Sequence, residues 1–194
     1  MPNRFSHLGA PPHSEHPHAV HFYSANSAME MHVGRFIHHG IQACDTVITI
    51  ATKERREGFA RYLRAACPDL EGRIDLLSSY YALDADEMLS AFLVNSHPDR
   101  SRFFASMDRM FSPFVRDGQP VRVFGEMVTR LWQAGQPDAA LELEGLWNEL
   151  SHRYTFSLLC AYPLGLFAGQ DPRRFLDTCA AHSQLSVPAP RAAA

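Results

Sequence analysis

Residues 18–30 read HAVHFYSANSAME, a short apolar run placed directly before a helical pattern. The run at 18–23 has the β-branched and aromatic composition of a buried strand. The apolar residues after it recur at helical spacing, with Asn26 or Ser27 as the expected N-cap and Gly40 near the expected end. In many α/β proteins a strand that runs straight into a helix binds a phosphate. This turn contains no glycine and no lysine, so it lacks the residues of a phosphate-binding loop.

Further apolar runs of strand length alternate with helical patterns along the rest of the chain. They lie at residues 45–51, 73–78, 121–126 and 154–162. Several are apolar almost throughout, as expected for strands that are covered on both faces. The sequence therefore predicts a three-layer α/β fold, with a mostly parallel sheet flanked by helices.

Helices are predicted between these strands. Thr52 is the expected cap of a helix that stops before Pro68, and an apolar face over 103–114 predicts another helix, which Pro113 should bend or end. Pro137 suits the first turn of a later helix. The apolar face of that helix has i, i+3, i+4, i+7 spacing at Leu143, Leu146, Trp147 and Leu150.

Length and composition are those of one ordinary soluble domain. The chain has 194 residues, 46% hydrophobic content and a net charge of −3, which gives no general attraction to nucleic acid or to anionic membranes. We expect a disordered leader at 1–17, a single domain at 18–182 and a disordered Pro/Ala tail at 183–194. The chain has no apolar run of membrane-spanning length and no signal-peptide pattern, so we expect a cytoplasmic protein.

Sequence motifs for metal, nucleotide or nucleophilic chemistry are missing. Four histidines lie close together, at His13, His16, His18 and His21, but the first two belong to the expected leader. The four cysteines form no CxxC pair, so no metal site is predicted. Neither GxxxxGK[ST], GxGxxG nor GxSxG occurs, and we predict no catalytic residue. The arginines after the second strand are expected to form a solvated helix face; they are Arg55, Arg56, Arg61 and Arg64.

Glu126 lies just past the end of a strand that we expect to be central. Ligands of open α/β sheets bind beyond the carboxyl ends of the strands. Glu126 is therefore either a functional group or a structural one that caps the helix starting at Met127. Because a buried carboxylate is costly without a partner, we expect it to pair with Arg122, Arg130 or a backbone donor.

Glu144 and Asn148 are four residues apart and so share one face of the predicted helix, beside Trp147. Polar groups at the border of an aromatic stripe can orient a ligand in an apolar pocket. The alternative is an amphipathic helix whose acidic side faces solvent. The pattern by itself leaves both interpretations open.

Three segments together resemble the MEDS domain, a methanogen/methylotroph sensory domain. They read HAVHFYSANSAMEMHVGRFIHHGIQACDTVITIAT, VRVFGEMVTRLWQAG and LELEGLWNELSHRYTFSLLCAYP, in the right order over about residues 17–168. The resemblance implies a RecA/KaiC-like fold that has lost its phosphate loop and serves as a sensory module. It also implies a small, hydrocarbon-derived ligand, and a histidine kinase or transcriptional regulator as partner.

On these grounds we expect a non-catalytic sensory domain that binds an unidentified small, apolar molecule and relays the signal to a separate partner, with no direct contact to nucleic acid or membrane. The cofactor is unknown. The expected ligand contacts, gathered at the carboxyl ends of the strands, are His18, Tyr23, Glu126, Glu144, Trp147 and Asn148. Two alternatives remain: an interaction module, such as a homodimer or kinase adaptor, without a ligand, and a divergent nucleotide hydrolase or phosphotransferase with Glu126 as its base.

Overall fold

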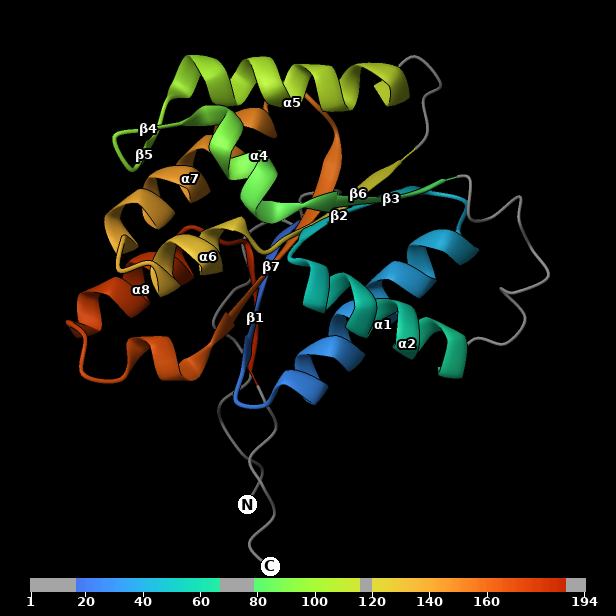
Figure 1. Ribbon diagram of the computed structural model, residues 1–194, viewed down its shortest axis with the longest axis horizontal. Helices are drawn as coiled ribbons and strands as arrows, with labels where there is room; N and C mark the ends of the chain where they lie inside the picture. Colours follow the sequence, from blue (N-terminus) through green and yellow to red (C-terminus); the bar gives the residue numbers. More distant parts are fainter. Residues whose placement is uncertain (1–16, 67–78, 116–119, 188–194) are drawn as a thin grey trace, which may run out of the picture.

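The computed structural model describes residues 17–66, 79–115 and 120–187. Its centre is a six-stranded sheet in the order β3-β2-β6-β7-β1-β8, in which every pairing is parallel. The strands are β1 (His18–Tyr23), β2 (Thr46–Ala51), β3 (Tyr80–Asp84), β6 (Val121–Gly125), β7 (Phe156–Pro163) and β8 (Gln184–Ser186). Helices cover both faces of this sheet (Figure 1), so the predicted three-layer α/β fold is confirmed.

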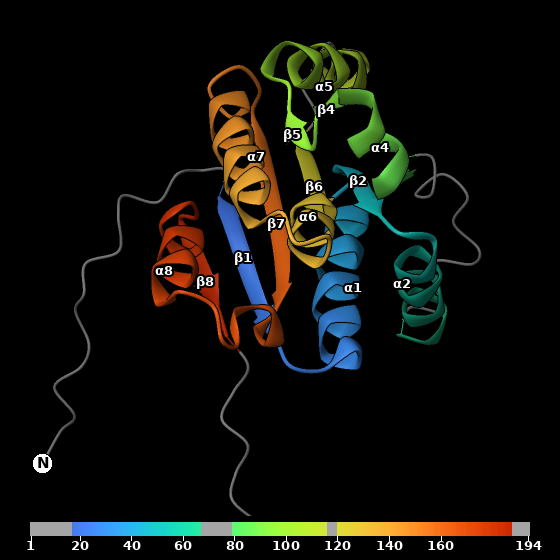
Figure 2. The same ribbon diagram turned by 60° about the vertical axis from the view of Figure 1, so that its left-hand side comes forward.

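The helices divide between the two faces. The packing of their buried side chains places α1 (Asn26–Gln42) and α2 (Lys53–Ala66) on one face. The other face carries α4 (Ala85–Phe92), α5 (Arg100–Val115), α6 (Met127–Gln133), α7 (Pro137–Leu150) and α8 (Pro172–Ala180). Figure 2 shows α7 and α8 beside β1 and β7. A short 3-10 helix, η2 (Leu164–Phe167), precedes α8, and β4 (Leu93–Val94) pairs with β5 (His97–Pro98) in a small antiparallel hairpin.

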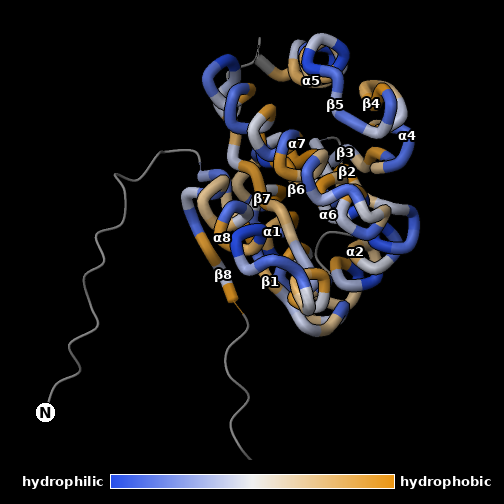
Figure 3. Tube along the Cα trace, turned by 90° about the vertical axis from the view of Figure 1, so that its left-hand side faces the viewer, coloured by the Kyte–Doolittle hydropathy of each residue, from blue (hydrophilic) through white to orange (hydrophobic). Residues whose placement is uncertain are grey.

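Strand alternation divides the apolar core between the two faces. In β1, Val20 and Phe22 belong to the core under α4–α8, whereas Tyr23 belongs to the core under α1 and α2. Successive side chains of a strand point to opposite faces, which requires this division. Figure 3 shows hydrophobic residues along the central strand β7 and hydrophilic stretches over the outer helices.

The route of the chain makes a topological switch point between β2 and β6. The chain passes over the α1/α2 face after β1 and β2, and over the opposite face after β6 and β7. The connections that follow the neighbouring strands β2 and β6 therefore lie on opposite faces of the sheet. A crevice at the carboxyl ends of two such strands is the usual ligand position in open α/β sheets. Glu126 follows β6 at this place.

Most predicted elements are confirmed; the unpredicted strands β3 and β8 lie at the edges of the sheet, and α4, α8 and the β4–β5 hairpin were not predicted either. The strands at 18–23, 45–51, 121–126 and 154–162 are present to within about two residues, whereas 73–78 lies outside the described residues. The edge strand β3 was not predicted, and its YYALD pattern is only half-buried. β8 corrects the expected tail, because Gln184–Ser186 pairs with β1.

Local details at the helix ends differ from the expected ones. The N-cap of α1 is Ala25, not Asn26 or Ser27. The Asn26 side chain accepts a hydrogen bond from Arg55 Nη2 at 3.0 Å. Pro113 lies within α5, which continues to Val115. Proline lacks an N–H, and the Arg109 carbonyl that it leaves without a backbone donor accepts from Ser112 Oγ at 3.4 Å.

His21 lies on the α1 face of β1 in a buried setting. Its ring stacks on His32 with centroids 3.9 Å apart, and its Nδ1 lies 3.1 Å from Ser186 Oγ. Tyr23 lies further along the same face, with ring centroids 6.5 Å apart. Burial, and secondly the charge of His32, lowers the pKa of His21 to about 4. The pKa of His32 is also lowered, by burial and then by Arg35.

Candidate ligand site at the amino ends of β1 and β7

A cluster of buried polar side chains lies between the sheet and helices α7 and α8. We call it the histidine–glutamate cluster; its members are His18, Glu144, Cys160, Tyr162 and His182. His18 pairs in register with Leu158, and Cys160 and Tyr162 follow at steps of two along β7. Alternation therefore turns all three polar side chains toward α7. Glu144 comes from α7, and His182 follows the end of α8.

Glu144 is the centre of this cluster and is fully buried. The hydroxyl of Tyr162 donates to its Oε1 at 2.7 Å, and Nε2 of His182 lies 3.3 Å from the same oxygen. Nε2 of His18 lies 3.1 Å from Oε2, and the Cys160 thiol donates to Oε2 at 3.7 Å. The sequence left open whether the acidic side of this helix faces solvent. The structure shows that the Glu144 side chain lies in the interior and not in solvent.

The cluster shifts the pKa values of its members. Burial alone would raise the pKa of Glu144, but His182 and His18 outweigh burial and hold it well below its usual range. Burial would lower the pKa of His182, yet the Glu144 carboxylate and the Thr178 carbonyl raise it. Burial, and then the negative charge of Glu144, raises the pKa values of Cys160 and Tyr162 well above their usual values. Glu144 is therefore ionised, while the Cys160 thiol and the Tyr162 phenol beside it are neutral.

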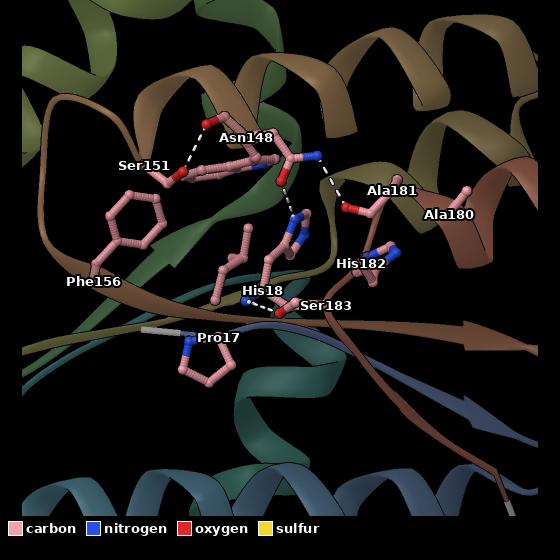
Figure 4. Close-up of a pocket in the computed structure, with 11 residues that line it drawn as sticks. Pro17, His18, Asn148, Ser151, Phe156, Ala180, Ala181, His182 and Ser183 are labelled. Carbon is pink, nitrogen blue, oxygen red and sulfur yellow. Dashed lines mark hydrogen bonds between the residues drawn. The ribbon is translucent and has the colours of Figure 1, made fainter. Parts of the chain in front are cut away.

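Hydrogen bonds on the far side of each imidazole ring fix its direction. Asn148 Nδ2 donates to the Ala181 carbonyl at 2.9 Å, so its Oδ1 faces Nδ1 of His18 at 2.8 Å (Figure 4). Because this oxygen can only accept, Nδ1 of His18 is the donor. Nδ1 of His182 donates in the same way to the Thr178 carbonyl at 2.6 Å. Both Nε2 atoms are thereby directed toward Glu144.

A cavity of about 370 Å³ adjoins the cluster. It lies at the amino ends of β1 and β7, where His18 and Phe156 begin these strands. Its lining combines apolar and polar side chains: Pro17, His18, Trp147, Asn148, Ser151, Phe156, Leu158, Ala180, Ala181, His182 and Ser183. Figure 4 shows His18 and Asn148 pointing toward each other within it. The cavity therefore offers apolar walls with a few convergent polar groups, the usual composition of a small-molecule site.

Glu126 forms a second polar group at the carboxyl ends of the strands. Its Oε2 accepts from the backbone N–H and the hydroxyl of Thr52, at 2.8 and 3.0 Å, and its Oε1 accepts from Arg55 Nε at 3.2 Å. The expected backbone donor is thus present, but Arg122 and Arg130 pair with other carboxylates. Glu126 makes no side-chain cap to α6. It joins β6 to the start of α2.

Arg55 continues this second group toward β1 and α1. Its Nη2 donates to the Tyr23 hydroxyl at 3.2 Å and to Asn26 Oδ1 at 3.0 Å. The expectation of a solvated face was wrong for Arg55, whose side chain is 11% exposed in its ion pair with Glu126. The carboxylate's burial explains why the guanidinium lies inward.

The six expected ligand contacts therefore lie in two places. His18, Trp147 and Asn148 line the cavity with Glu144 behind them, whereas Tyr23 and Glu126 belong to the group around Arg55. His18 and Tyr23 begin and end β1, about 16 Å apart at ~3.3 Å per residue. One site at the carboxyl ends cannot contain both. The part that each residue plays in binding stays a prediction.

Sequence reasoning missed three members of the cluster. The sequence singled out Cys160 only as one of four cysteines without a CxxC pair, whereas its buried thiol donates to Glu144. Tyr162 and His182 were not considered. The spacing of two between Cys160 and Tyr162 was the available signal for a shared strand face. His182 lies 38 residues from Glu144 by their numbering, and no local pattern connects them.

The fold and these two groups define a parallel α/β domain that lacks phosphate-loop motifs and holds a small cavity beside buried ionisable side chains. A scan against family models matches residues 17–182 to MEDS, the methanogen/methylotroph, DcmR sensory domain. The chain belongs to this family, which confirms the resemblance and indicates a sensory role. Searches of curated proteins and of solved structures returned no match. Within the described residues, every helix is too short or too polar to cross a membrane.

Proposed function

We propose that this chain is a non-catalytic cytoplasmic sensory domain that binds a small molecule in the cavity at the amino ends of β1 and β7. The observation that carries the proposal is the convergence of His18, Asn148 and His182 on a cavity that also has apolar walls. Family membership supports the sensory role. The ligand would compete for the Asn148 amide group while its apolar part packs on Trp147 and Phe156.

The size of the cavity favours a small ligand. A volume of about 370 Å³ is near the lower end of the range of ligand pockets, ~300–1,000 Å³. A second cavity of similar volume lies under α4 and α5, where Arg109 is the charged group among mostly apolar lining residues. Its Arg109 Nη2 donates to Ser106 Oγ at 3.4 Å, and its lining contains fewer polar side chains than that of the first cavity. We therefore place an apolar molecule with one hydrogen-bonding group in the first cavity.

The lining of the cavity provides a route for the signal. Ala181, His182 and Ser183 connect α8 to β8, and they also bind the start of β1 and the end of α7. A ligand that competes for the Asn148 side chain would weaken its bond to Ala181. The equilibrium position of α8 and β8 would then shift, together with the surface that they present. The recipient would be a separate histidine kinase or transcriptional regulator, as the family resemblance implies.

The two alternatives make different predictions about the same protein. An interaction module without a ligand predicts that small molecules leave the melting temperature unchanged. A nucleotide hydrolase with Glu126 as base predicts stabilisation by ATP and Mg²⁺. Its base would need a carboxylate oxygen free to take a proton. The two oxygens of Glu126 already accept three hydrogen bonds, from Thr52 and Arg55.

Blocking the cavity tests the proposal. Ser151 lines the cavity and is exposed, so Ser151→Trp should fill the space without disturbing the core, and Ser151→Ala is the matched control. The probes are short-chain alcohols and halogenated methanes, and the readouts are thermal denaturation and tryptophan fluorescence with a chelator present. We expect saturable stabilisation of the wild type and of Ser151→Ala, but not of Ser151→Trp. Equal responses in all three proteins would refute binding in this cavity.

A further inference from the structure

The histidine–glutamate cluster contains four side chains that are typical metal ligands. Nε2 of His18, a carboxylate oxygen of Glu144, Sγ of Cys160 and Nε2 of His182 all lie within 4.8 Å of one another. The four come from β1, α7, β7 and the segment after α8. Three of them are buried and His18 is nearly so, which distinguishes the group from an accidental surface cluster.

The spacing of these atoms fits a tetrahedral ion. Zinc with bonds of ~2.0 Å to nitrogen and oxygen and ~2.3 Å to sulfur places neighbouring ligand atoms about 3.3–3.6 Å apart. Nε2 of His18 lies 3.1 Å from Oε2 of Glu144, and Nε2 of His182 lies 3.3 Å from Oε1, so a small rotation of the carboxylate would place one oxygen beside both rings. Sγ of Cys160 lies 3.6 Å from Nε2 of His18 and 3.7 Å from Glu144. From this geometry we propose that His18, Glu144, Cys160 and His182 bind one divalent transition-metal ion, with zinc as the best fit.

The rings are already oriented for coordination. A metal-bound histidine usually donates its other ring N–H to a carbonyl or carboxylate, which fixes the ring and its tautomer. His18 donates to Asn148 and His182 donates to the Thr178 carbonyl, so both Nε2 atoms face the proposed ion. Nε2 of His182 is buried and lies 3.3 Å from Glu144 Oε1, but without the geometry of a good hydrogen bond. A metal ion would give this nitrogen a directed bond.

The charges of the ligand set also match a divalent ion. A thiolate and a carboxylate contribute two negative charges, while the two imidazoles bind as neutral rings. On binding, Cys160 releases its thiol proton and His182 releases the Nε2 proton of its ion pair with Glu144, both to solvent. The buried site would then be neutral overall, which avoids the cost of a net charge in the interior. The mixture of nitrogen, oxygen and sulfur ligands favours zinc over magnesium or calcium.

The adjacent cavity provides an entry path for the ion. His18 and His182 line it, and Glu144 and Cys160 lie behind them. The metal site does not depend on the small-molecule proposal, because its ligands are complete without any occupant of the cavity. Ser151→Trp should abolish probe binding and leave the equilibrium affinity for zinc intact, and Cys160→Ser should weaken zinc binding. Failure of one proposal is thus distinguishable from failure of the other.

The test is metal binding by the full-length chain after treatment with chelator. Zinc is titrated against a chromophoric chelator, and cobalt replaces zinc to report the ligands by its absorption spectrum. We expect one ion per chain and a sulfur-to-cobalt charge-transfer band. Cys160→Ser should abolish that band, and His182→Ala should weaken binding by at least about tenfold. Asn148 is no metal ligand but orients His18, so Asn148→Ala should weaken binding by ~10–100-fold.

Matched variants control for other cysteines and histidines. Cys179 is half-buried outside the cluster, so Cys179→Ser should retain the cobalt band and the zinc affinity. A triple change of His7, His13 and His16 to Gln tests the histidines that precede the described residues, and it should also retain both. Circular dichroism checks that each variant is folded. If His182→Ala does not fold, Cys160→Ser and the partly exposed Asn148→Ala still decide the matter.

Two results would overturn the metal proposal. One is a folded wild-type chain that binds no zinc or cobalt under these conditions. The other is a cobalt band that persists in Cys160→Ser or disappears in the triple histidine variant. Either outcome would leave the cluster as a metal-free network of Glu144 with its histidines.

Discussion

Replacing Glu144 by leucine in metal-free protein tests how far the cluster depends on this carboxylate. The substitution keeps an apolar helix former of similar size but removes the counter-charge of His182, whose side chain is fully buried. It also removes the acceptor of the Tyr162 hydroxyl, bonded at 2.7 Å. A buried hydroxyl without a partner costs about 1–3 kcal/mol, and breaking a buried ion pair costs about 3–5 kcal/mol. Because the contributions overlap, we expect a total loss of about 3–5 kcal/mol.

Urea denaturation in the presence of chelator measures this free energy of unfolding. The double variant Glu144→Leu with His182→Leu should be less destabilised than the sum of the single variants, because it leaves no uncompensated charge. A coupling of about 1–3 kcal/mol is expected. The control is Glu142→Leu on the same helix: Glu142 is 52% exposed in its pair with His97, and its loss should cost no more than about 0.5 kcal/mol. A cost below about 1 kcal/mol for Glu144→Leu, or additive single effects, would refute the reasoning.

Three more predictions concern other parts of the fold. Lowering the pH from 8 to 5 should destabilise the wild type by about 2 kcal/mol more than His21→Leu, since the pKa of about 4 means that the fold favours the neutral ring. Gly34→Ala should cost about 1–3 kcal/mol in urea denaturation, because its Cβ would lie 2.2 Å from the Tyr62 ring. Glu126→Gln should cost about 1–3 kcal/mol in the same assay, because it weakens the bond to Arg55.

Each of these three predictions has a control variant or a result that would contradict it. For His21, stability is complete above the ordinary pKa of 6.5 and is lost as the pH falls toward 4, so parallel pH curves of wild type and variant would contradict it. For Gly34, the control is Gly145→Ala in α7, where an added Cβ meets nothing within 4 Å. An equal cost at both glycines would count against close packing of α1 on α2. For Glu126, the control is Glu149→Gln, whose exposed pair with Arg100 should contribute little.

The fold class was predictable because it depends on local patterns. The apolar runs and the helical spacing along the chain indicate alternating strands and helices, and each can be recognised from a few neighbouring residues. β3 was missed because an edge strand is covered less completely, and β8 because it has only three residues. The identity of Ala25 as the N-cap of α1 was not predictable either, because Asn26 bonds to Arg55 from another helix.

The candidate site was predictable only in part. Glu144 and Asn148 were recognised together because i, i+4 spacing places them on one helix face. Their partner His182 follows a different helix and has no sequence pattern that relates it to them. The expectation of no metal site rested on the lack of regular ligand spacing, yet the proposed ligands are drawn from four separate segments.

The sequence by itself determined the alternation of strands and helices, the lack of phosphate-loop motifs and, through its resemblance, the family. These properties depend on local backbone preference and on side-chain periodicity, which neighbouring residues specify. The tertiary structure alone decided that Glu126 bonds to Thr52 and Arg55, and that His18 meets Glu144 and His182 instead of Tyr23. The order of strands in the sheet sets these contacts. That order arises from the packing of the whole core, which no short stretch of residues contains.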